Sequence, residues 1–81
     1  MSQTITLESM RADIARILRE DPADIADDDN LMDLGLDSMR TMTLASQWRA
    51  AGASIEFPEM ALNATLEHWW ALIQASRQRG A

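Results

Sequence analysis

The sequence contains no cysteine, no tyrosine and only one histidine, His68. Without cysteine the chain can form no disulfide, and one histidine is too few for the usual zinc ligand sets. No apolar run approaches the roughly 20 residues that a membrane-spanning helix needs. These absences argue against a disulfide-stabilised fold, a zinc module and a membrane span.

Acidic residues outnumber basic ones by 13 to 7, so the net charge is −6 and the pI is about 4.4. A domain of this charge repels nucleic-acid phosphates and anionic membrane surfaces. The polar start after Met1 has no signal-peptide pattern. We expect a single cytoplasmic domain over residues 1–81 that is monomeric and binds neither nucleic acid nor membranes.

The first apolar stripe predicts a helix that begins after Thr6, a good N-cap residue. Ile5 and Met10 have the spacing of a hydrophobic staple. The helix should end at Asp21, because the residue before Pro22 is disfavoured in helical geometry. The stripe consists of Leu7, Met10, Ile14, Ile17 and Leu18.

A second helix is predicted over residues 38–51, with Gly52 as its stop signal. Met39 and Met42 lie off its apolar stripe, on a face beside Ser38. They either form a partly exposed patch or fill gaps in the core, and the sequence leaves both interpretations open. The stripe consists of Thr41, Leu44, Ala45, Trp48 and Ala51.

After Pro58 the sequence predicts one short helical turn over residues 59–62 and then a last helix capped by Thr65. His68 falls opposite the apolar stripe of that helix, so we expect it to be a solvated residue. The pattern predicts an all-α fold, a small four-helix bundle with three main helices and one short helix. The last stripe consists of Leu66, Trp69, Trp70, Leu72 and Ile73.

Residues 22–37 form a long connection crowded with aspartates. A calcium loop starting at Asp27 would place Leu31 at a ligand position and Met32 where glycine is required, so that hypothesis fails. We interpret the segment as a solvated acidic loop. The side chains expected to pin it to the core are Ile25, Leu31, Leu34 and Leu36.

Ser38 stands where this acidic loop meets the second predicted helix. Asp37 or Ser38 can supply the N-cap oxygen, and Gly35 allows a conformation that side chains disfavour. The free N–H groups and positive dipole end of a helix's first turn suit an anion such as a phosphate ester.

A catalytic role for Ser38 does not fit its surroundings. A hydrolase elbow reads Gly-x-Ser-x-Gly, but Arg40 occupies the place of the second glycine. No cysteine is present, and the lone histidine is distant in sequence, so no base is evident for a serine nucleophile. The sequence therefore predicts a protein that is not an enzyme.

The stretch Leu34-Gly35-Leu36-Asp37-Ser38-Met39 resembles the phosphopantetheine attachment motif of carrier proteins. The resemblance implies that a phosphopantetheinyl transferase moves 4′-phosphopantetheine from coenzyme A onto Ser38. It also implies that Asp37 caps the helix and takes part in transferase recognition. The thiol of the arm, which this cysteine-free chain cannot supply itself, then carries an acyl group as a thioester.

Residues 29–40, the pair Trp48-Arg49 and residues 63–70 resemble aryl carrier proteins of siderophore-type nonribosomal peptide pathways, although Ala64 stands where relatives often have proline. We expect a free-standing carrier. The resemblance implies that an adenylating ligase loads an aryl acid such as dihydroxybenzoate or salicylate, and that a condensation domain receives it. The alternatives are a peptidyl or polyketide-type acyl carrier and, from another class, a small helical interaction domain in which Ser38 is only a cap.

The charges of residues 38–51 differ from the acid-rich second helix of fatty-acid carriers. Arg40 and Arg49 are the only charged residues in this range, and both are basic. We therefore expect partners to meet an apolar, weakly basic helix. The predicted partner-binding residues are Met39, Arg40 and Met42.

Overall fold

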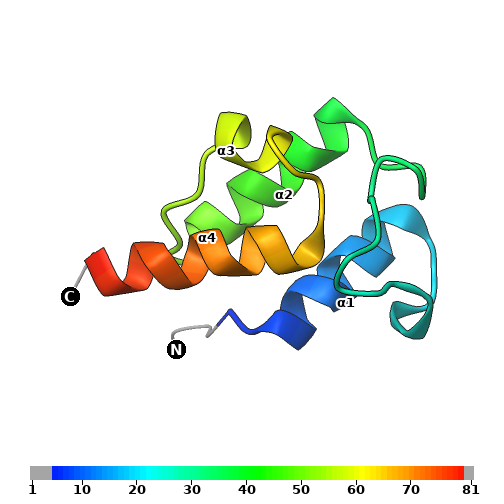
Figure 1. Ribbon diagram of the computed structural model, residues 1–81, viewed down its shortest axis with the longest axis horizontal. Helices are drawn as coiled ribbons and strands as arrows, with labels where there is room; N and C mark the ends of the chain where they lie inside the picture. Colours follow the sequence, from blue (N-terminus) through cyan, green and yellow to red (C-terminus); the bar gives the residue numbers. More distant parts are fainter. Residues whose placement is uncertain (1–4, 80–81) are drawn as a thin grey trace.

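A computed structural model describes residues 5–79, and the regular elements in this range are all helical, as predicted (Figure 1). No helix in this part of the chain is long and apolar enough to cross a membrane. The elements in chain order are α1 (Leu7–Leu18), the 3-10 helix η1 (Pro22–Asp24), α2 (Ser38–Ala50), α3 (Phe57–Ala61) and α4 (Leu66–Arg79).

The start of α1 is fixed by the predicted cap and staple. Thr6 Oγ1 accepts the amide of Ser9 at 3.0 Å, and Ser9 Oγ accepts the amide of Thr6 at 2.9 Å. This reciprocal capping box satisfies two backbone donors that would otherwise lack partners. Ile5 and Met10 are both buried, so the staple prediction is confirmed.

The end of α1 comes earlier than predicted, at Leu18 instead of near Asp21. Arg19 adopts a left-handed conformation with φ 59° and donates its amide to the carbonyls of Ala15 and Arg16. Glu20 donates its amide to the Ala15 carbonyl at 2.9 Å. These bonds close the helix locally, so the restriction that a proline imposes on its predecessor is not what ends α1.

The core lies where the helices meet around two tryptophans. Helix α1 packs against α2 and α4, and α3 packs against α2 and α4. Trp48 of α2 and Trp69 of α4 meet edge to face with ring centroids 6.0 Å apart. Both indoles are buried, whereas Trp70 is half-buried with the Arg77 guanidinium 5.5 Å from its ring centroid. The centre of each predicted apolar stripe is therefore confirmed as core, and the remaining stripe residues are half-buried against it.

The long loop is anchored by three of the four side chains expected to pin it. Ile25, Leu31 and Leu36 are buried, but Leu34 is 37% exposed, so its assignment to the core was wrong. Leu34 lies in a tight turn in which its amide donates to the Leu31 carbonyl at 3.1 Å. That turn directs Leu31 and Leu36 inward and leaves no interior position for the side chain between them.

The expectation that His68 is solvated was also wrong. His68 is half-buried, and its Nε2 lies 3.2 Å from the carbonyl oxygen of Glu59, which links α4 to α3. The predicted cap of α4 is confirmed, because Thr65 Oγ1 accepts the amide of His68 at 3.2 Å. A helical wheel of α4 alone could not show that α3 covers this face.

Candidate functional site: the exposed start of helix α2

Ser38 is the first residue of α2 and its side chain is exposed. Asp37 precedes it in extended geometry, and its Oδ1 accepts the amide of Arg40 at 2.9 Å. The choice between Asp37 and Ser38 as N-cap is therefore settled in favour of Asp37. Because the carboxylate does the capping, the Ser38 hydroxyl is left facing solvent at the positive end of the helix dipole.

The backbone just before Ser38 is held firmly. Thr41, which is fully buried, donates its amide and its hydroxyl to the Asp37 carbonyl at 2.9 and 2.8 Å. Leu36 is buried, and Gly35 has φ +111°, a conformation that residues with side chains rarely adopt. The serine is thus presented from a rigid junction between loop and helix.

The surroundings of Ser38 fit attachment of a group better than catalysis. Among the described residues, no carboxylate or imidazole forms a hydrogen bond to its hydroxyl. The amides of Ser38 and Met39 belong to the first turn, which has no intrahelical acceptors and suits a phosphodiester. An exposed hydroxyl beside these donors can hold 4′-phosphopantetheine, whereas activation of that hydroxyl must come from a partner enzyme.

The methionines beside Ser38 lie on the surface. Met39 is 79% and Met42 is 51% exposed, and Arg40 is also exposed, so the structure excludes the interpretation that the methionines fill the core. Leu62, just after α3, is 83% exposed and was not singled out by sequence reasoning. Leu62 follows the end of a short helix and belongs to no apolar stripe, so the sequence pattern does not show whether it is buried or exposed.

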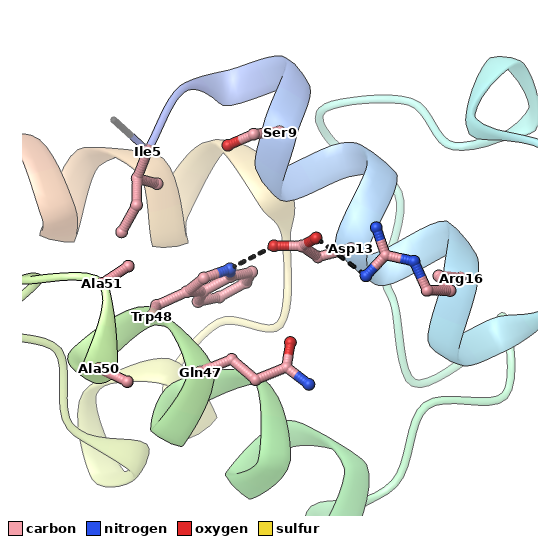
Figure 2. A pocket seen from close by; sticks show the side chains of 8 residues that line it. All are labelled: Ile5, Ser9, Asp13, Arg16, Gln47, Trp48, Ala50 and Ala51. Carbon is pink, nitrogen blue, oxygen red and sulfur yellow. Dashed lines mark hydrogen bonds and ion pairs between the residues drawn. The ribbon is translucent and has the colours of Figure 1, made fainter. Parts of the chain in front are cut away.

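A hollow of about 680 Å³ lies elsewhere, between α1 and the C-terminal half of α2 (Figure 2). In it the Trp48 indole points from α2 toward α1, where Asp13 Oδ2 accepts its N–H at 3.0 Å. Arg16 pairs with the same carboxylate at 3.2 Å. None of the residues that line the hollow belongs to the first two turns of α2, so the exposed start of α2 is a separate surface.

The family model described as "Phosphopantetheine attachment site" matches residues 8–73, which include most of the described chain and the whole Ser38 junction. The chain belongs to this family of carrier proteins. It is therefore a helical carrier that bears covalent 4′-phosphopantetheine and is not itself the catalyst.

Curated relatives support the same placement. The chain is 46% identical to isochorismatase of Bacillus subtilis (strain 168) over 74 residues, which are 91% of this chain and 24% of that protein. It is 40% identical to the acyl carrier protein ScoB of Streptomyces coeruleorubidus over 81 residues, 100% of this chain and 94% of ScoB.

A third relative is a large synthase. The phenyloxazoline synthase MbtB of Mycolicibacterium paratuberculosis (strain ATCC BAA-968 / K-10) is 39% identical over 71 residues, 88% of this chain and 6% of that protein. The chain thus spans nearly all of ScoB but only a small part of the other two relatives. No solved structure matches it.

Proposed function

We propose that Ser38 carries the 4′-phosphopantetheine of this carrier and that the arm holds an aryl acid as a thioester. The observation that carries the proposal is the exposed Ser38 hydroxyl on the first turn of a helix capped by Asp37. In the transfer, Ser38 Oγ attacks the phosphorus of coenzyme A that bears the pantetheine arm. The new Ser38 O–P bond replaces the P–O bond of the pyrophosphate, 3′,5′-ADP leaves, and the hydroxyl proton passes to a base of the transferase. The chain's own contribution is to present the hydroxyl and to offer first-turn amides to the phosphate.

Three observations support an aryl cargo. The stretch that leads to Ser38 resembles aryl carriers. One relative is named a phenyloxazoline synthase, and a phenyl group is an aryl group. Helix α2 contains no acidic residue. An adenylating ligase activates and loads the aryl acid, such as a dihydroxybenzoate or salicylate. A nonribosomal peptide condensation domain of a siderophore-type pathway then receives the aryl group. With these partners, we expect the carrier to work in the cytoplasm.

The partners dock on the exposed start of α2 in this proposal. Met39 and Met42 offer flexible apolar side chains, and Arg40 adds a positive charge beside Ser38. Methionine adapts to differently shaped surfaces, which suits a carrier that visits a transferase, a ligase and a condensation domain in turn. Tethering keeps the cargo at a high effective concentration at each of them.

A second candidate is an acyl carrier for a peptidyl or polyketide-type group. The match to ScoB, which is named an acyl carrier protein and is covered almost completely, favours it. The two candidates share Ser38 and differ only in cargo. Incubation of the holo protein with ligases that activate salicylate, dihydroxybenzoate or an amino acid separates them, because only the matching ligase should produce a thioester that intact mass detects.

The attachment site is tested by incubating the protein with coenzyme A, magnesium and a broad-specificity phosphopantetheinyl transferase. Intact mass should show one phosphopantetheine addition in the wild type and none in Ser38→Ala. Ser46→Ala, which removes another exposed hydroxyl of α2, is the matched control and should be modified normally. An addition that persists in Ser38→Ala would contradict the assignment. Circular dichroism should show both variants folded, because Asp37 still caps the helix.

A further inference from the structure

The acidic side chains of the loop that leads to Ser38 repel one another. Residues 20–37 contain many aspartates and no lysine, arginine or histidine. Like charges this close together disfavour a compact loop. Its second half is held by the buried Leu31 and Leu36, but Ile25 is the only buried side chain between residues 20 and 30. A positive charge from outside the loop would offset this repulsion and help to hold the first half in place.

Arg11 of α1 supplies that charge. Its side chain is only 14% exposed, and its guanidinium donates to the Ile25 carbonyl, to the Asp27 carboxylate and to Glu8. The hydrogen bond to Asp27, and to a lesser extent the one to Glu8, raises the pKa of Arg11 above its ordinary value. The guanidinium therefore stays charged at any pH at which the protein is folded. Among the ion pairs of the described residues, Arg11–Asp27 is the one that reaches the loop.

The residue that Arg11 holds is itself joined to α4. The Asp27 carbonyl accepts the amide of Glu67, in the first turn of α4, at 3.0 Å. Four residues later the Leu31 amide donates to the Ala64 carbonyl at 2.8 Å. Arg11 therefore fastens to α1 a loop segment that pairs with the start of α4, at the side of the molecule where α2 also begins (Figure 1).

Backbone hydrogen bonds continue from Leu31 to Leu36, two residues before Ser38. The Leu31 carbonyl accepts the amides of Leu34 and Leu36, each at 3.1 Å. Leu36 is buried and is followed directly by Asp37, the N-cap of α2. A short series of hydrogen bonds therefore connects the segment held by Arg11, through the start of α4 and Leu31, to the residue just before the cap.

We propose that Arg11 is a positioning residue for the modification of Ser38. By holding Ile25 and Asp27 against α1, it sets the path along which the loop enters α2, and so the orientation of the serine hydroxyl in the transferase. The inference rests on the proposed attachment at Ser38. Only arginine carries donors enough, in a planar fork, to reach a carbonyl and two carboxylates together.

The test compares Arg11→Gln with Arg16→Gln in transferase kinetics. Arg16 is on the same helix, but it is 72% exposed and pairs only with Asp13 of α1, so it controls for the loss of one positive charge. In Arg11→Gln, kcat should fall about tenfold because the hydroxyl is misoriented, while KM should hold because Met39 and Met42 are intact. Arg16→Gln should match the wild type in both constants.

Amide hydrogen exchange supplies a second measurement that does not depend on the transferase. In Arg11→Gln the amides of Leu36 and Glu67 should exchange faster, whereas that of Trp48 in the core should not change. An unchanged kcat in Arg11→Gln, or an equal fall in Arg16→Gln, overturns the proposal. Faster exchange together with an unchanged kcat also overturns it, because the contact would then only stabilise the loop.

Two safeguards keep the test decisive. If Arg11→Gln does not fold, Asp27→Ala replaces it, since this change removes the side-chain acceptor of Arg11 and keeps the backbone carbonyl that accepts from Glu67. A lower kcat in Asp27→Ala supports the proposal and an unchanged one contradicts it. Failure of the wild type to gain phosphopantetheine at Ser38 would instead contradict the proposed function, and the exchange rates would still report whether Arg11 holds the loop.

Discussion

Two faces of α2 carry apolar side chains, but only one of these faces is buried in the core. One face buries Thr41, Leu44, Ala45 and Trp48 against the other helices. The other leaves Met39 and Met42 in solvent, beside Ser38. A helix that only had to support the fold would place polar residues on its outer face. Because Met39 and Met42 are largely exposed, we expect them to contribute little to folding, which favours a role in docking.

The two faces should also differ in how much stability a substitution on each of them costs. Large residues packed against one another in a core lose much stability when truncated, whereas exposed residues lose little. Three substitutions therefore test the comparison, ordered by the expected loss in the free energy of unfolding.

The largest loss is expected from Trp48→Ala. The indole is buried and contacts Trp69, so its removal should cost about 3–5 kcal/mol, comparable to the whole stability of a domain this small. Thermal unfolding followed by circular dichroism should show a large fall in Tm or no folded protein. An unchanged Tm would show that the buried face of α2 does not hold the molecule together. Trp70→Ala, which truncates a half-buried indole, should lower Tm less.

A smaller loss is expected from Asp13→Leu. This change leaves the Trp48 N–H without its acceptor and should cost about 1–2 kcal/mol, at the lower end of the usual range because water reaches the hollow. Asp13→Asn is the matched control, since its amide oxygen can still accept the indole proton. Chemical denaturation measures both. Equal losses in the two variants would mean that the charge of Asp13, and not its acceptor atom, stabilises the contact.

The smallest loss of stability, and the largest loss of loading, is expected from Met42→Asp. Met42 is 51% exposed, so unfolding should change by about 0.5 kcal/mol or less. If Met42 enters an interface, the buried carboxylate should lower the kcat/KM of ligase loading about tenfold or more. The measurement compares loading of holo wild type and variant at low and high salt.

Gln47→Asp is the control for Met42→Asp. It adds the same charge to α2 at an exposed position beside the hollow, away from Ser38. Loading that falls equally in both variants and recovers with salt would point to steering by net charge and not to an apolar docking surface. Loading of Met42→Asp at the wild-type rate would remove Met42 from the docking surface altogether.

Most of the fold could be predicted because its determinants are local. The caps Thr6 and Thr65, the stop of α2 before Gly52 and the apolar stripes all depend on spacings within one helix, and the structure confirms them. The errors arose where a neighbouring element covers a face, or where the chain turns or ends a helix in a way that an apolar stripe does not show. His68 is covered by α3, and Leu34 faces out because a turn gives the interior to Leu31 and Leu36.

The candidate site divides in the same way. Ser38 follows from a contiguous motif, whose helix start and cap are as predicted, while its modification stays a prediction. The residues that sequence reasoning missed act across long separations. Arg11 meets Asp27 from another element, and Asp13 meets Trp48 across 35 positions of the chain. Single arginines and aspartates on a helix carry no sign of such a partner, so only the folded chain reveals them.

The contact between Trp48 and Trp69 gives the core a spectroscopic signal of its own. With no tyrosine in the chain, near-ultraviolet absorption and emission come almost wholly from the three tryptophans, and these two meet edge to face in the interior. Two indoles held at a fixed angle give a circular dichroism signal that disappears when the helices separate. The start of α2 has no aromatic residue, so a partner bound there leaves this signal unchanged unless it also disturbs the core.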